Sequence, residues 1–144
     1  MTRYQIAYTT GTYDLFHVGH LNLLRSAKAL CEYLIVGVNT DEITFSYKNQ
    51  YPVIPFQERL EIVKAIKYVD KAIPQDSIDK MAAWNKLHFD VLIHGDDRKG
   101  SKRFQFIENQ LSSVGVDLIF LPYTKSTSST MIRKVIEKGL LKNN

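Results

Sequence analysis

The sequence contains one cysteine, Cys31, among 144 residues. A single cysteine excludes an intrachain disulfide and any metal site that needs several thiolates, so we expect a reducing, cytoplasmic setting. Free cysteine is among the most frequently buried residues, and we expect Cys31 to pack in the core rather than to act in catalysis. Long apolar runs are also missing. None approaches the roughly 20 residues needed to cross a bilayer, and we expect neither a targeting segment nor a membrane partner.

Several motifs of nucleotide binding and catalysis are absent. No Gly-x-Gly-x-x-Gly follows the first predicted strand and no P-loop lysine motif occurs, which argues against a dinucleotide site and against a P-loop. No serine lies in a nucleophile elbow, which argues against a catalytic triad. His17 and His20 lack the further ligands that zinc requires, so we predict no metal held by protein side chains.

The charge of the chain has little bias. The formal net charge of +4 is spread along the sequence. Nucleic-acid-binding domains usually carry a steeper basic bias with interleaved aromatic residues, so we expect no nucleic-acid partner and favour a cleft for a small anion. The apolar fraction of 44% and the charged fraction of 24% are ordinary for a globular protein. The length suits a single domain over residues 1–144.

Short β-branched runs alternate with amphipathic segments along the chain. The apolar runs predict five strands, at Gln5–Thr9, Tyr33–Asn39, Lys71–Pro74, Val91–His94 and Leu118–Leu121. Helical spacing of apolar residues predicts helices over residues 21–31, 56–66, 78–87, 104–114 and 132–140. This alternation predicts an α/β fold, a Rossmann-like doubly wound five-stranded parallel sheet. In such sheets ligands bind at the carboxyl ends of the strands, where the strand order reverses.

One long connection, Asp41–Pro55, interrupts this alternation. A loop of this length in a small domain is more often functional than idle, so we interpret it as a mobile flap. Lys48 is the residue of this flap expected to contact a phosphate. An exposed lysine without function fits its position equally well.

The segment Gly11–His20, GTYDLFHVGH, lies between the first predicted strand and a helical pattern that starts at Leu21. A glycine turn followed by a helix N-terminus favours phosphate, because free backbone N–H groups and the helix dipole point at the ligand. His17 and His20 are three residues apart, so both imidazoles can reach one anion, and Gly19 lets the backbone approach a phosphate oxygen. The segment predicts a nucleotide triphosphate site, and packing of the two histidines is the alternative.

A second, hydroxyl-rich helix start lies near the end of the chain. Ser126–Thr130 consists of hydroxyl residues that run into a helical pattern, and Ser128 or Ser129 suits the N-cap. Arg133, one turn inside, is placed to hold the same anion with its two-pronged guanidinium. Plain capping with a surface arginine is the alternative. Because this junction follows the fifth strand as the histidine segment follows the first, the two together predict a polyphosphate held between two helix N-termini, two histidines and an arginine.

A third polar segment, His94-Gly95-Asp96-Asp97, follows the fourth predicted strand. Paired acids at a strand end suit Mg²⁺ or the amino group of a base. They equally suit the cap of the next segment. The residues alone do not distinguish among these three roles.

Four segments together resemble the cytidylyltransferase family of the HxGH nucleotidyltransferase superfamily. They are GTYDLFHVGH, KYVDKAIP at Lys67–Pro74, HGDD, and the Ser-Ser-Thr-x-x-Arg ending. Within the family they are most similar to the bacterial glycerol-3-phosphate cytidylyltransferases, with choline- and ethanolamine-phosphate enzymes as relatives. The resemblance covers nearly the whole chain. It is specific for nucleotidyl transfer and much less specific for the acceptor.

The resemblance implies a role for each matching residue. His17 and His20 hold the triphosphate and the departing charge, and Lys48 and Arg133 complete the catalytic set. Arg59 and Lys67, together with the flap lysine, contact substrate phosphates. Asp97 accepts a hydrogen bond from the cytosine amino group. The other nucleotide-binding positions implied by the resemblance are Thr10, Gly11, Thr12, Tyr13, Gly19, Thr124, Ser128, Ser129 and Thr130.

The implied reaction is transfer of CMP from CTP, with Mg²⁺ or another divalent cation, to a small phosphomonoester by a homodimer. Glycerol 3-phosphate is the leading acceptor. The alternative acceptors are ethanolamine phosphate, choline phosphate and another polyol phosphate. The alternative functions are adenylyl transfer and nucleotide binding without turnover. Tyr123 and Lys125 stand where the family commonly has arginine and glutamate, Lys67 where arginine is usual, and Arg98 where the glycerol-phosphate enzymes often have tryptophan. These departures leave the acceptor open.

Overall fold

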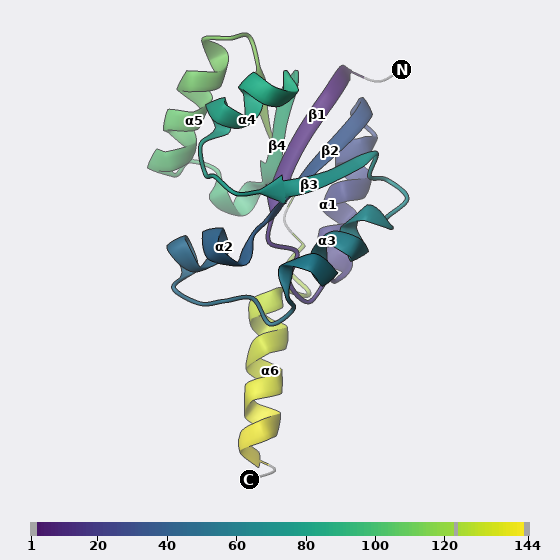
Figure 1. Cartoon of the computed structure of the whole chain (residues 1–144), viewed down its shortest axis with the longest axis vertical. Helices are drawn as coiled ribbons and strands as arrows, with labels where there is room; N and C mark the ends of the chain where they lie inside the picture. The colour runs from purple at the N-terminus through teal and green to yellow at the C-terminus, as the bar shows by residue number, and fades with distance from the viewer. Residues whose placement is uncertain (1–2, 123, 143–144) are drawn as a thin grey trace.

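The computed structural model describes residues 3–122 and 124–142. Five parallel strands form one sheet in the order β3-β2-β1-β4-β5, with β1 at its centre (Figure 1). The strand order reverses between β1 and β4, which confirms the predicted Rossmann-like α/β fold. The strands are β1 (Tyr4–Gly11), β2 (Cys31–Asn39), β3 (Lys71–Gln75), β4 (Val91–Gly95) and β5 (Asp117–Leu121).

Helices connect the strands and cover both faces of the sheet (Figure 1). They are α1 (Val18–Lys28), α2 (Asp41–Lys48), α3 (Phe56–Lys64), α4 (Lys80–Leu87), α5 (Lys102–Ser112) and α6 (Ser129–Lys142), with a 3₁₀ turn η1 (Asp96–Arg98) after β4. α1 and α3 pack on one face, and α4 and α5 pack on the other.

The two faces of the central strand each enter a separate core. Ala7 and Tyr8 are both fully buried, Ala7 against α1 and α3 and Tyr8 against α4 and α5. Burial on both faces explains why the strands appear in the sequence as nearly continuous apolar runs. With both faces covered, polar side chains gather at the strand ends.

The observed helix ends differ from the predicted ones by a few residues, and one of the differences assigns a strand residue to a helix. The helix predicted over residues 21–31 ends at Lys28, and Cys31 instead begins β2. Cys31 is buried there, so its predicted packing role is confirmed.

The predicted flap is not a loop throughout, because its first half forms α2. The hydroxyl of Thr40 accepts a hydrogen bond from the Ile43 N–H at 3.2 Å, which caps the helix. Asn49, in the left-handed conformation, ends it. Lys48 therefore sits on the last turn of a helix rather than on a free loop.

The last helix, α6, has a different position from the others. It begins beside the turn after β1, where the Ser129 hydroxyl donates to the carbonyl oxygen of Asp14 at 2.5 Å, and its far end projects away from the sheet (Figure 1). Only its first turns reach the carboxyl edge of the sheet. Within the described ranges, no helix combines the length and the apolar character that a membrane span requires.

Candidate active site

The two histidines form the cap of α1. His17 is the N-cap residue, and its Nδ1 accepts a hydrogen bond from the Gly19 N–H at 3.0 Å. His20, at the third helical position, accepts the backbone N–H of His17 on its own Nδ1 at 3.1 Å. This is a capping box in which two imidazoles replace the usual hydroxyl and carboxylate. The motif therefore starts the helix and presents both rings at its N-terminus.

The capping box fixes the protonation state of both rings. A ring nitrogen that accepts an N–H carries no proton, so each neutral imidazole has its proton on Nε2. Burial lowers the pKa of His17, and burial together with the charges of His17 and Lys48 lowers the pKa of His20 to about 3. The ring centroids are 3.9 Å apart. At neutral pH the site thus offers two adjacent neutral donors.

Gly19 is required by the cap itself. A Cβ at this position would lie 2.8 Å from Cε1 and 3.0 Å from Nδ1 of His17. Any larger residue would push the His17 ring out of its hydrogen bond. The sequence predicts that Gly19 lets the backbone approach a phosphate oxygen. In the structure the group that lies close to Gly19 is the His17 imidazole.

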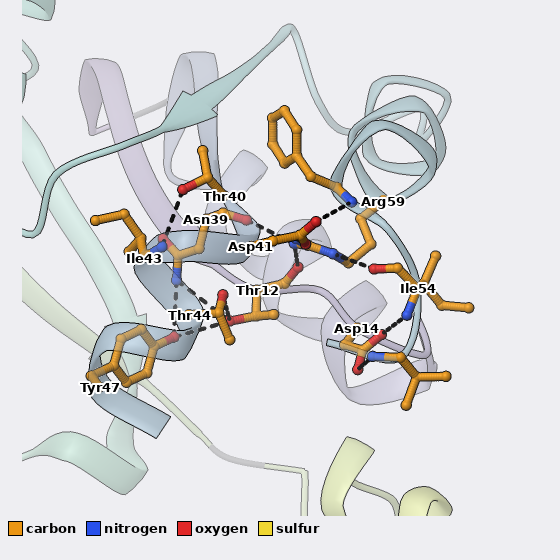
Figure 2. A network of polar contacts seen from close by, with 12 residues as sticks. Thr12, Asp14, Asn39, Thr40, Asp41, Ile43, Thr44, Tyr47, Ile54 and Arg59 are labelled. Carbon is orange, nitrogen blue, oxygen red and sulfur yellow. Dashed lines mark hydrogen bonds and ion pairs between the residues drawn. The ribbon is translucent and has the colours of Figure 1, made fainter. Parts of the chain in front are cut away.

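The carboxylate of Asp14 joins three segments. It is 4% exposed and accepts hydrogen bonds from the N–H groups of Val53 at 2.8 Å and Ile54 at 2.9 Å (Figure 2). Arg133 on α6 also donates to it, at 3.0 Å. Asp14 thus holds the segment after α2 and the first turns of α6 against the turn that follows β1.

The hydroxyl residues at the start of α6 have two roles, capping the helix and lining a cavity. Ser128 Oγ accepts the Met131 N–H at 3.1 Å, as predicted for an N-cap. Ser129 and Thr130 line a cavity beside the histidines. Thr124 Oγ1 accepts a hydrogen bond from Asn22 at 3.2 Å.

Two cavities share a wall at the carboxyl edge of the sheet. The shared residues are Thr10, Gly11, Thr12 and Lys48. The smaller cavity, of about 250 Å³, is also lined by Tyr13, His20, Ser129, Thr130 and Arg133. The larger cavity, of about 280 Å³, lies toward β3, α4 and α5 and is lined by Asn39, Tyr47, Ser77, Lys80, Asp97 and Arg103, among others. The structure thus brings the two predicted helix starts to one cavity.

A polar network holds α2 over the shared wall. The Thr12 and Tyr47 hydroxyls are 2.9 Å apart, and the Asn39 amide donates to the Tyr47 hydroxyl at 3.0 Å (Figure 2). These contacts tie α2 to the ends of β1 and β2. Lys48, the next residue after Tyr47, is thereby placed between the cavities.

Arg59 does not occupy the phosphate-binding position implied by the resemblance. Its side chain is fully buried, and its guanidinium donates to the Thr12 carbonyl at 2.6 Å and the Asn39 carbonyl at 2.8 Å. It also pairs with Asp41 at 2.7 Å and bonds to the Ile54 carbonyl (Figure 2). Because its donors point into the protein, Arg59 braces the floor of the site.

Lys67 also lies away from both cavities. It precedes β3 and therefore sits near the amino ends of the strands, where its ammonium lies 5.2 Å from the Tyr68 ring centroid. Both cavities open at the carboxyl ends. Tyr123, another of the positions that depart from the family pattern, lies outside the described residues.

Sequence reasoning missed Lys80. This lysine is 5% exposed, lines the larger cavity and donates from Nζ to the Thr10 hydroxyl at 2.9 Å. Nothing in the sequence distinguishes it from a surface lysine at the start of a helix. Its burial depends on the approach of α4 to the end of β1.

A family model described as cytidylyltransferase-like matches residues 8–135, a span that includes both helix starts. The chain belongs to this family. The match confirms the resemblance found in the sequence and identifies this cytidylyltransferase as a CTP-dependent nucleotidyltransferase.

Curated relatives of this cytidylyltransferase differ in the acceptor that they name. The chain is 35% identical to the glycerol-3-phosphate cytidylyltransferase of Bacillus subtilis over 136 residues, covering 89% of this chain and 94% of that protein. It is 38% identical to the ethanolamine-phosphate cytidylyltransferase of Dictyostelium discoideum over 102 residues, covering 65% of this chain and 27% of that protein.

Solved structures support the fold of this cytidylyltransferase. The lipopolysaccharide core biosynthesis protein of Thermoplasma volcanium matches with a TM-score of 0.72 at 23% identity, covering 86% of this chain and 99% of that one. The pantoate-beta-alanine ligase of Francisella tularensis matches with a TM-score of 0.62 at 15% identity, covering 88% and 62%. At these identities the likeness concerns the fold alone.

Proposed function

We propose that this cytidylyltransferase transfers CMP from CTP to glycerol 3-phosphate, forming CDP-glycerol and pyrophosphate. The observation that carries the proposal is the convergence of two helix N-termini, those of α1 and α6, on one small cavity. Helix N-termini bind anions through free N–H groups and the positive end of the helix dipole. The triphosphate of CTP is the ligand that this arrangement fits.

The smaller cavity supplies donors and charge to the triphosphate. His20 lines it and the ring of His17 packs against that of His20, so their Nε2–H groups are the neutral donors for phosphate oxygens. Arg133 and Lys48 add positive charge. Fixed donors aimed at oxygens that gain charge stabilise the transition state more than the ground state.

The reaction itself needs no protein nucleophile. An oxygen of the acceptor phosphate attacks the α-phosphorus of CTP in line and forms the new P–O bond, while the bond to the β-phosphate oxygen breaks and pyrophosphate leaves with the electron pair. A phosphomonoester, with its second pKa near 6, is mostly dianionic at neutral pH, so no general base is required. The chain's contribution is positioning and charge neutralisation.

The divalent cation belongs to the substrate in this proposal. Among the described residues, no group of three or more His, Cys, Asp or Glu side chains gathers where it could hold a metal ion. Mg²⁺ commonly binds through phosphate oxygens and water with few protein ligands. It therefore fits this site as part of the MgCTP complex, where it neutralises triphosphate charge.

Recognition of the base is assigned to Asp97. Asp97 follows β4 and lines the larger cavity. A carboxylate there accepts a hydrogen bond from the cytosine amino group. Adenine also offers an amino group, so comparison of the four nucleotides is part of the test.

Ethanolamine phosphate is the second candidate acceptor, because curated relatives with that activity in their names match the chain at 38% to 42% identity. The same chemistry serves either acceptor. Glycerol 3-phosphate is favoured because relatives with that name match along most of their length.

Pyrophosphate release measured with each of the four NTPs against glycerol 3-phosphate, ethanolamine phosphate and choline phosphate tests the proposal. We expect release with CTP and glycerol 3-phosphate above every other pair. Release only with ATP, or no release with any phosphomonoester, would overturn it. Sedimentation of the pure protein tests the expected homodimer in the same preparation.

A further inference from the structure

The strand β5 forms an edge of the sheet. It is the last strand in the order β3-β2-β1-β4-β5, so β4 is its one partner among the described strands. The Asp117 N–H donates to the Asp90 carbonyl, which turns the backbone groups of Asp117 toward β4. Because backbone groups alternate in direction along a strand, those of Leu118 and Phe120 point outward. Residues 3–122 and 124–142 provide no backbone partner for these outward groups.

The opposite edge of the sheet is protected against a further strand. There β3 contains Pro74, which has no N–H to donate, and the exposed Lys71. Proline and lysine are residues that commonly prevent edge strands from pairing. Residues 118–121 of β5, LIFL, contain neither and are all apolar. The two edges therefore differ, and β5 is the one that can accept another strand.

A groove of about 370 Å³ runs along this edge between β5 and α5. The half-buried Leu118 and Phe120 line it together with Phe104 of α5. Two exposed charged residues also line it, Lys99 and Glu108. Lys99 precedes α5 near the end of β4, and Glu108 lies further along α5, which runs back toward the start of β5. The two charges thus lie toward opposite ends of the groove.

We propose that β5 pairs antiparallel with β5 of a second copy of this chain, about a two-fold axis at Ile119. In this register Leu118 lies opposite the partner's Phe120, and Phe120 opposite the partner's Leu118. Both residues point their backbone groups outward, so each pair exchanges its N–H···O bonds in both directions. The pairing extends the sheet across the axis. This inference goes beyond the proposed function and does not depend on it.

The side chains are self-complementary across the same axis. Leu118 and the partner's Phe120 meet on the α5 face as an aliphatic–aromatic pair, which stabilises antiparallel strands, and they fill the groove. A two-fold axis exchanges the two ends of the groove, so Lys99 faces the partner's Glu108, and Glu108 faces the partner's Lys99. An extended peptide would have to bring the same apolar pair and both charges in the right order, whereas a second copy already carries them.

Oxidative cross-linking tests the register. Cys31, the one native cysteine, is buried, so a cysteine introduced on β5 reports without interference. Ile119 lies on the axis, where the Cα atoms of a non-hydrogen-bonded pair are about 4.5 Å apart, within reach of a disulfide. Leu121→Cys, on the same face of β5, is the matched control, because its copies would be separated by roughly 13 Å along the strand. We expect at least tenfold more cross-linked chain in Ile119→Cys than in Leu121→Cys. Equal cross-linking in both variants, or none in either, overturns the proposal.

Charge reversal at the ends of the groove gives a second measurement that leaves the core unchanged. Glu108→Lys places a lysine against the partner's Lys99 and should raise the dissociation constant, measured by sedimentation, at least tenfold. Adding Lys99→Glu should restore the wild-type constant within threefold. Glu61→Lys, the same change at an exposed position of α3 on the other face of the sheet, should leave it unchanged. No weakening in Glu108→Lys, or no rescue in the double variant, overturns pairing with a second copy and leaves a different chain as the occupant of this edge.

Discussion

Replacement of His17 separates its two roles. His17 caps α1 through Nδ1 and, in the proposed mechanism, donates from Nε2 to the triphosphate. Asparagine is as good an N-cap as any residue, so His17→Asn keeps the backbone hydrogen bond and removes the imidazole donor. His17→Ala removes both.

The expected magnitudes follow from these two contacts. Loss of the cap in His17→Ala should cost about 1 kcal/mol of unfolding free energy. For a chain of this length that cost lowers Tm by roughly 3 °C. His17→Asn should melt within about 1 °C of the wild type. Both variants should lose roughly 10²–10³-fold in kcat, because each lacks one preorganised donor.

Thermal melts followed by circular dichroism, together with pyrophosphate release at saturating CTP and acceptor, measure both quantities. Wild-type turnover in His17→Asn would show that the imidazole serves only as a cap. If His17→Asn lowered Tm as much as His17→Ala does, the capping argument would be wrong.

Three further predictions concern the frame of the site. The pKa of His20 is about 3 in the folded protein and 6.5 in the unfolded chain. The contribution of the neutral ring to the free energy of unfolding is therefore complete above pH 6.5 and is lost as pH falls toward 3, at about 1.4 kcal/mol per pH unit. His20→Gln, which keeps a capping-box residue, should have a flatter stability–pH curve in urea titrations, and an identical curve would contradict the pKa assignment. Gly19→Ala should displace the His17 ring and cut kcat at least tenfold while CTP still binds, and unchanged turnover would refute the steric argument. Arg59→Met should lower the free energy of unfolding in urea by about 3 kcal/mol or more, because it leaves Asp41 and buried carbonyls without donors. A variant with normal stability but weak CTP binding would instead support the phosphate contact that the resemblance implies for Arg59.

The strand–turn–helix core of the site could be predicted from sequence because its signals are local. Gly11, the histidine pair and the apolar run before them lie within one short segment, and Ser128 caps α6 as its position indicates. Parallel strands bring such segments to one edge regardless of their separation in sequence.

The roles of Arg59 and Lys80 could not be predicted because they depend on contacts between distant segments. Arg59 resembles a surface arginine on a helix, but its partners come from the ends of β1 and β2 and from the loop before α3. Lys80 is buried only because α4 approaches Thr10. α2 was missed for a different reason, since its eight residues are too few for a strong apolar pattern, although Thr40 and Asn49 mark its ends.

A crystal structure with MgCTP bound tests the central claim most directly. The account predicts phosphate oxygens within hydrogen-bonding distance of His20 Nε2 and of the N-terminus of α6 at Ser129–Thr130, inside the smaller cavity. A triphosphate bound elsewhere, with this cavity filled only by water, would contradict it.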